Sequence, residues 1–124
     1  MKKRKRFDHF LALIDREGLP VPETEVAFVP GRRFRADYLW PEHRVIVERD
    51  GGIMQFPGQR YGRAAAGAHS RVEGILRDME KANLAQIAGY VFLRFTGRDL
   101  DTGAALTTIR AALDGRHVVA RRSS

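Results

Sequence analysis

The stretch RRFRADYLWPEHRVIVERDGG, residues 32–52, decides the fold that we expect for this chain. It contains two runs of β-prone residues, 33–40 and 44–50, separated by a short Pro-Glu-His connection that suits a hairpin turn. The pair Gly51-Gly52 then ends the second run. The stretch therefore predicts two antiparallel strands.

The carboxylates of these two strands are spaced so that they share a face. If the turn pairs Leu39 with Arg44, Asp37 and Glu48 become diagonal neighbours, about 7 to 8 Å apart at the backbone and within reach of one shared ion. Asp50 lies on the same face because side chains alternate with period two along a strand. The other face is then expected to carry Phe34, Ala36, Tyr38, Val45 and Val47.

Clustered carboxylates repel one another, so each one loses its charge or destabilises the fold unless a cation is present. A hard ion such as Mg²⁺ or Mn²⁺ removes this conflict, and it also activates water and stabilises charge on a phosphate. The pattern leaves a second interpretation open, in which Glu48 pairs with Arg35 and Asp50 with Arg33 in ordinary cross-strand salt bridges.

Periodicity predicts the remaining elements. Helical spacing of apolar residues predicts helices over 7–18, 69–88 and 99–113, and β-rich runs predict strands over 21–29 and 90–95. The longest helix carries an apolar stripe made of Val72, Ile75, Leu76, Met79, Ala82 and Ile87. The order helix, three strands, helix, strand, helix predicts an α/β fold with a central mixed sheet flanked by helices.

The length of 124 residues fits a single domain, 1–124, with a basic arm at 1–6, a flexible basic loop at 53–68 and a basic tail at 115–124. The absence of cysteine excludes disulfides, thiolate zinc sites and cysteine nucleophiles. The charged start is followed by FDHFLALIDREG rather than by an apolar stretch, which indicates a cytoplasmic protein that does not enter a membrane.

The excess of positive charge, 22 Lys and Arg against 15 Asp and Glu, indicates a polyanionic partner. Arginine contacts phosphate in a planar, bidentate manner, so DNA is the expected partner. The candidate DNA contacts are Arg32, Arg33, Arg60, Arg63 and Arg71. Tyr61 is a candidate for stacking on a base or for anchoring its loop. A basic protein without any nucleic-acid role remains an open interpretation.

The stretch quoted above, followed by GAHSRVEGILRDMEKANLAQIAGYVFLRFT at 67–96, resembles the nuclease domains related to very-short-patch-repair endonucleases, within the PD-(D/E)xK restriction-endonuclease-like superfamily. The similarity covers about 25–113. It implies a restriction-endonuclease-like core in which Asp37 and Glu48 bind a divalent metal ion.

The chain departs from that superfamily pattern at one position. The pattern places a lysine two residues after the acidic residue of the third strand, and Asp50 stands there in this chain. A carboxylate cannot replace an ammonium group in orienting water or neutralising phosphate. Asp50 is therefore expected to be an additional metal ligand, and Lys81 or a nearby arginine to supply the missing charge. Lys81 lies on the side of its helix away from the apolar stripe, so a merely solvated Lys81 is an equally open interpretation.

Three further residues have two interpretations each. Asp78 is a metal-associated acid or an ordinary helix-surface partner of Arg71 or Lys81. His69 is a general base or phosphate contact, or a solvent-facing side chain. Glu25 completes the metal site, or is a solvated strand residue.

The expected function is that of a Mg²⁺-dependent endonuclease, which cuts DNA with a metal-activated water and without a covalent intermediate. The first alternative is a non-catalytic nucleic-acid-binding domain on a degenerate nuclease scaffold. The second is a basic structural protein that binds RNA. A homodimer is expected only by analogy with other small nucleases that cut two strands.

Overall fold

The chain forms four helices and four strands in the residues that the computed structural model describes, 6–50 and 68–115, with 68–71 described in backbone only. In chain order they are α1 (His9–Arg16), β1 (Glu23–Ala27), β2 (Arg35–Trp40), β3 (Val45–Arg49), α3 (Ala68–Ile87), β4 (Val91–Phe95), α4 (Gly97–Thr102) and α5 (Leu106–Leu113). The predicted order of elements is confirmed up to β4. The predicted arm at 1–6, loop at 53–68 and tail at 115–124 lie almost entirely outside the described residues.

The last predicted helix, over 99–113, is two helices instead of one. Thr96 caps α4 by accepting a hydrogen bond from the Asp99 N–H, and Gly103 ends it with a φ of 90°. This left-handed conformation suits glycine and stops a helix. The prediction was wrong because apolar residues on both sides of the break, Leu100, Ala105 and Ile109, bury in the same core and so give one continuous apolar pattern in the sequence.

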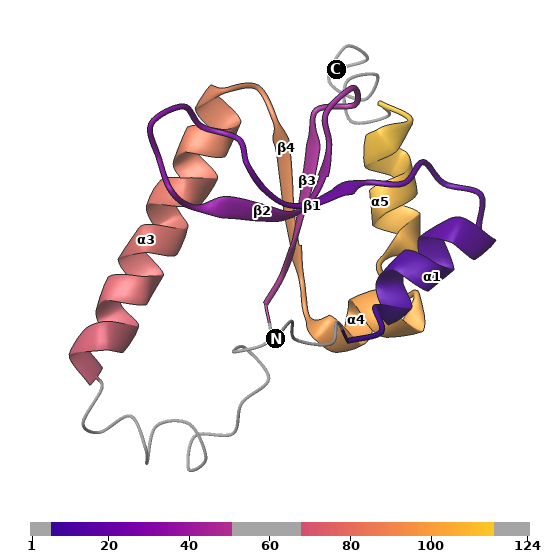
Figure 1. Cartoon of the computed structure of the whole chain (residues 1–124), viewed down its shortest axis with the longest axis horizontal. Helices are drawn as coiled ribbons and strands as arrows, with labels where there is room; N and C mark the ends of the chain where they lie inside the picture. The colour runs from indigo at the N-terminus through magenta and orange to yellow at the C-terminus, as the bar shows by residue number, and fades with distance from the viewer. Residues whose placement is uncertain (1–5, 51–67, 116–124) are drawn as a thin grey trace, which may run out of the picture.

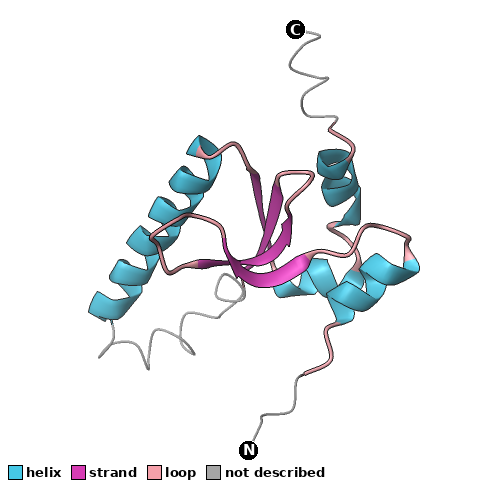
Figure 2. Ribbon diagram, turned by 45° about the horizontal axis from the view of Figure 1, so that its top comes forward, coloured by secondary structure: helices cyan, strands magenta, loops and turns pink. Residues whose placement is uncertain are grey.

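The four strands form one mixed sheet in the order β1-β2-β3-β4. β1 pairs antiparallel with β2, and β2 with β3, whereas β3 and β4 run parallel. The chain reaches β4 from β3 through α3, as a parallel connection requires. Figures 1 and 2 show the sheet with α3 on one side and α1, α4 and α5 on the other, which confirms the predicted α/β class.

Each face of the sheet has its own apolar core. On one face Trp40, Val45 and Val47 pack against the helices α1, α4 and α5, with Phe10 and Ile109 among the fully buried side chains. On the other face a smaller cluster joins Ala36, Leu39 and Ile46 to Ala85 of α3. The smaller cluster lies beside the carboxylates discussed below.

The predicted register between β2 and β3 is wrong by two residues. Leu39 pairs with Ile46, not with Arg44, because the connection comprises the four residues 41–44. Arg44 closes this turn with a left-handed φ of 58° and donates its N–H to the Pro41 carbonyl oxygen at 3.3 Å. A shift by two keeps every side chain on its face.

The predicted apolar face is also wrong in part. Tyr38 packs on the side of α1, α4 and α5, but Ala36 belongs to the cluster on the α3 side. Phe34 lies near Phe28, a residue packed against that same cluster, with ring centroids 5.7 Å apart. The simple alternation fails next to Glu25, whose left-handed φ of 51° interrupts the pleat between two paired residues of β1.

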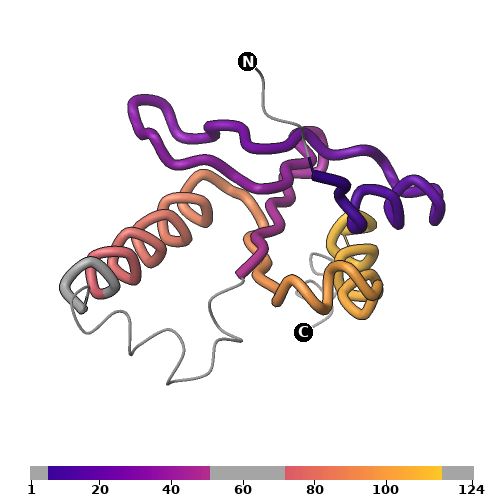
Figure 3. Tube along the Cα trace, turned by 60° about the horizontal axis from the view of Figure 1, so that its bottom comes forward, coloured from indigo at the N-terminus to yellow at the C-terminus, as the bar shows by residue number. Residues whose placement is uncertain are grey.

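The long helix α3 does not bury its predicted stripe. Val72, Ile75, Leu76 and Met79 are each about half exposed, and Ile87 is more so. The helix packs mainly against β4 through its later residues, and its first half extends beyond the sheet (Figures 1 and 3). The side of α3 that meets the sheet therefore carries Ala85 and Lys81. None of the described helices has the length and hydrophobicity needed to span a bilayer.

Candidate active site

Asp37 and Glu48 hold each other in place across the β2–β3 ladder. Continuing the observed register places them directly opposite one another rather than diagonally. The Asp37 N–H donates to Glu48 Oε2 at 2.8 Å, and the Arg49 N–H donates to Asp37 Oδ2 at 2.8 Å. Both residues line one hollow of about 230 Å³. Two carboxylates are therefore held at fixed positions in a shared site by backbone groups of the opposing strand.

Lys81 reaches this hollow from α3. Its Nζ lies 2.6 Å from Glu48 Oε1, and the two side chains are only 12% and 13% exposed. Burial raises the pKa of Glu48 above the ordinary glutamate value, although the hydrogen bonds from Lys81 and from the Asp37 backbone act in the opposite direction. The interpretation of Lys81 as a solvated surface residue is thus wrong.

Asp50 also lines the hollow, but its partner is Arg94 of β4, with Nη2 2.8 Å from Asp50 Oδ2. Arg94 is opposite Glu48 in the parallel β3–β4 register, so the neighbouring strand supplies this cation. The same Nη2 lies 3.7 Å from Asp78 Oδ2 of α3. Arg94 therefore links two carboxylates at the rim.

The salt bridges considered from sequence, Glu48 with Arg35 and Asp50 with Arg33, are not the pairs that form. Arg35 Nη1 instead donates to the Glu25 carbonyl oxygen at 3.5 Å. The predicted pairs fail because the β2–β3 register is shifted, and because Lys81 and Arg94 come from α3 and β4.

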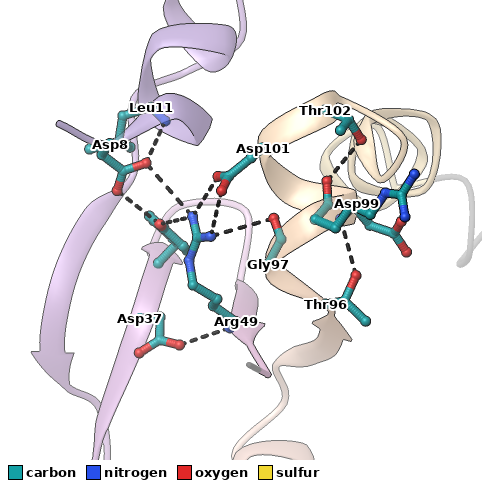
Figure 4. A network of polar contacts seen from close by, with 11 residues as sticks. Asp8, Leu11, Asp37, Arg49, Thr96, Gly97, Asp99, Asp101 and Thr102 are labelled. Carbon is teal, nitrogen blue, oxygen red and sulfur yellow. Dashed lines mark hydrogen bonds and ion pairs between the residues drawn. The ribbon is translucent and has the colours of Figure 1, made fainter. Parts of the chain in front are cut away.

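Arg49 belongs to a polar network on the other side of β3, shown in Figure 4. Its guanidinium binds Asp101 of α4 through two hydrogen bonds of 3.1 and 3.2 Å, and donates to the Tyr38 hydroxyl at 3.0 Å. Tyr38 in turn donates to Asp8, the residue that caps α1, at 2.8 Å. Burial lowers the pKa of Arg49, but the bonds to Asp101 and Tyr38 outweigh it and raise the net value.

This network explains how the site is anchored. The Arg49 backbone orients Asp37, while the Arg49 side chain joins β3 to α1 and α4. Arg49 was not among the functional residues predicted from the sequence. The signal was its position between Glu48 and Asp50, because period-two alternation turns that side chain toward the opposite face.

The charges of the hollow leave an excess of acid. Among the described residues, four carboxylates line it, those of Asp37, Glu48, Asp50 and Asp78. The cations of the described chain that are directed at them are Lys81 and Arg94, since the Arg49 guanidinium is bound to Asp101 on the far side. Four described negative groups against two positive groups would favour the binding of a cation.

The donor atoms suit a hard divalent ion held by few protein ligands. Among the described residues no group of three acidic or imidazole side chains is placed to hold a metal ion together. The predicted set of four ligands, Asp37, Glu48, Asp50 and Glu25, is therefore not assembled as one group. Mg²⁺ is often held by one or two carboxylates and completes its shell with water and substrate phosphate, so Asp37 and Glu48 are the described residues that could hold it.

Glu25 lies beside Asp37 on β1, between the pairs Thr24–Tyr38 and Val26–Ala36. It is exposed and lines a second, wider hollow together with Asp37. A residue other than glycine in the left-handed region is strained, and such strain concentrates at functional sites. Glu25 is thus adjacent to the site but is not part of the acidic hollow.

The remaining candidates are distributed more widely. Arg32 and Arg33 lie between β1 and β2 and line a hollow of about 480 Å³ against α3, where Arg32 Nη2 is 2.7 Å from Glu80 Oε1. Arg60, Arg63 and Tyr61, and the side chains of His69 and Arg71, lie outside the described residues. The backbone of His69 is at the start of α3.

No protein family model, curated protein or solved structure matches the chain, so its function is inferred from the geometry of this site.

Proposed function

We propose that the chain is a metal-dependent endonuclease that hydrolyses phosphodiester bonds in DNA. The observation that carries the proposal is the convergence of Asp37, Glu48 and Lys81 in one hollow, from two strands and a helix. The α/β order and the mixed sheet are compatible with a restriction-endonuclease-like core. Mg²⁺ or Mn²⁺, held by Asp37 and Glu48, would activate a water molecule and stabilise charge on the phosphate.

The backbone of β2 and β3 contributes by holding both carboxylates before substrate arrives. Each accepts an N–H from the facing strand, so neither has to reorganise during the reaction. This pre-organisation is the feature expected of groups that must keep a fixed geometry around a reacting phosphate.

Lys81 would replace the lysine that the superfamily pattern has in place of Asp50. Its ammonium lies one hydrogen bond from Glu48 and lines the same hollow as Asp37. At that place it can neutralise a phosphate oxygen or orient a water molecule. Arg94 neutralises Asp50, which reduces the repulsion that this carboxylate would exert on DNA.

The choice of DNA as substrate follows from charge. The chain has a formal net charge of +7, and arginines 32 and 33 lie on the connection that reaches toward α3 (Figure 3). Arginine-rich surfaces bind the phosphate backbone with an affinity that falls steeply as salt increases. Such phosphate contacts position the protein on the DNA, but they do not select a base sequence.

The test is cleavage of supercoiled plasmid in the presence of Mg²⁺, Mn²⁺ or a chelator. The wild-type protein should nick the plasmid with either ion and not with the chelator, and Glu48→Gln should abolish nicking. The control is Glu17→Gln, which changes a partly exposed acid that pairs with Arg110 of α5 and not with a group of the hollow. If the wild-type protein does not cut and Asp37→Asn binds DNA equally well, the chain is a non-catalytic binding domain.

A further inference from the structure

The second hollow, of about 1010 Å³, shares Asp37 and Arg49 with the candidate active site. Hollows that bind small organic ligands measure about 300 to 1,000 Å³. A DNA strand whose phosphate lies at Asp37 would therefore have room for its next base in this hollow. Its walls decide which chemical group fits there.

One wall is aromatic and exposed. Phe7 lines the hollow, and its side chain is 71% exposed although it is a large apolar group. The ring meets His9 edge to face, with centroids 4.8 Å apart. Leu11 and Ala12 of α1 continue this wall. An exposed aromatic ring beside apolar side chains is the kind of surface on which single-stranded nucleic acids stack their bases.

The floor of the hollow is polar, and its hydrogen bonds are already formed. Tyr38 donates to Asp8 and accepts from Arg49, so these groups do not depend on a ligand for their hydrogen bonds. Thr24 and Glu25 stand at the β1 edge and offer polar atoms to the rim of a ring. A heterocycle with polar edges matches this combination of an apolar wall and a polar border.

The charged groups of the lining leave no free cation cluster for a phosphate among the described residues. There, three carboxylates, from Asp8, Glu25 and Asp37, stand against the two cations Arg6 and Arg49, and Arg49 is already bound to Asp101. Such a lining suits a neutral ring better than a second phosphate.

We propose that this hollow is a nucleobase subsite that stacks one unpaired base of the cut strand on Phe7. The subsite deepens the proposed nuclease function and rests on it for the position of the strand. A base inside a duplex is stacked and paired, so it reaches such a hollow only when it is unpaired or turned out of the helix. The preferred substrate is accordingly DNA with an unpaired nucleotide next to the cut phosphate.

The test compares binding to two DNA duplexes of the same sequence, one fully paired and one with a single unpaired 2-aminopurine. The Glu48→Gln background keeps both uncut. The bulged DNA should bind about 10-fold more tightly, a factor in the range of one base–aromatic stack, and its fluorescence should be quenched on binding. Phe7→Leu should remove both effects and Phe7→Trp should retain them. Val21→Ala, at a residue that is 72% exposed but does not line the hollow, is the matched control.

Two outcomes overturn the subsite. The first is an equal affinity of the protein for the paired and the bulged duplex. The second is an unchanged preference of Phe7→Leu for the bulged duplex, because an aliphatic side chain cannot stack on a base. Plasmid cleavage by the wild-type protein and by Phe7→Ala separates the two proposals. If the protein cuts plasmid but its preference for bulged DNA does not depend on Phe7, the nuclease proposal stands and the subsite is refuted. If the protein prefers bulged DNA through Phe7 but does not cut, the subsite stands on a non-catalytic binding domain. Circular dichroism of each variant verifies folding, which truncation of an exposed side chain should preserve.

Discussion

The substitution Lys81→Met tests whether the helix lysine is bound into the acidic hollow. Methionine keeps most of the volume of the side chain but removes the ammonium that lies 2.6 Å from Glu48 Oε1. Because Glu48 is only 13% exposed, water can replace the lost cation only in part. The carboxylate is then left without its charge partner in a desolvated place.

The expected loss is a large part of the stability of the fold. Removing one partner of a buried ion pair destabilises a protein by about 3 to 5 kcal/mol. A single domain is stable by only about 5 to 15 kcal/mol. The Arg32–Glu80 pair provides the comparison, because its atoms are 2.7 Å apart but its side chains are 39% and 48% exposed. Breaking an exposed pair costs roughly 0 to 1 kcal/mol.

The assay is urea denaturation at neutral pH in a chelator, with Glu80→Gln as the matched control. The double variant Lys81→Met/Glu48→Gln should recover much of the loss, because it removes the unpaired charge. Lys81 opposes the rise of the Glu48 pKa, so its removal raises that pKa further. The loss should therefore shrink when the pH falls below the ordinary glutamate value of 4.5, where Glu48 is protonated in both states. A loss in Lys81→Met no greater than that in Glu80→Gln would refute this account.

Two further predictions concern the surroundings of the site, and a third concerns two arginines outside the described residues. Burial raises the pKa of Tyr38 to about 12 from 10.0. Between these pH values the folded protein keeps a proton that the unfolded chain releases, so the free energy of unfolding should fall by about 1.4 kcal/mol per pH unit. Tyr38→Phe should flatten this alkaline loss in denaturation curves, and an unchanged slope would contradict the assignment. Asp101→Asn should weaken the anchor of Arg49 and lower the free energy of unfolding by at most about 1 kcal/mol, because the pair is partly exposed. A cleavage rate that this substitution leaves unchanged would mean that the anchor does not orient Asp37. Replacing Arg60 and Arg63 by alanine should weaken DNA binding and lower the slope of log affinity against log salt, whereas an equal slope would remove them from the interface.

The acidic face was predictable because it depends on a short-range property of the chain. Alternation with period two puts Asp37 on one side of β2 and Glu48 and Asp50 on one side of β3, whatever the exact register. The register error of two residues therefore left the shared hollow intact. An error of one residue would have separated the carboxylates.

The partners of these carboxylates were not predictable from local pattern. The Arg44 turn conformation fixes the register, and a left-handed residue other than glycine has no clear sequence signal. The side that α3 turns toward the sheet depends on its packing against β4. The apolar stripe predicts the wrong side, because the residues of that stripe are exposed. Lys81 enters the site through this long-range packing, and Arg94 enters it through the pairing of β4 with β3.

The position of Lys81 gives it two opposed effects on the proposed chemistry. It neutralises Glu48 when the hollow holds no other cation, and it thereby stabilises the fold. A divalent ion held by Glu48 in the proposed nuclease would therefore compete with the Lys81 ammonium for this carboxylate. Lys81 would remain in the hollow that Asp37 also lines, where it could contact a phosphate. A lysine on a helix, unlike the strand lysine of the superfamily pattern, would thus serve the proposed nuclease as a counter-ion before substrate binds and as a phosphate contact afterwards.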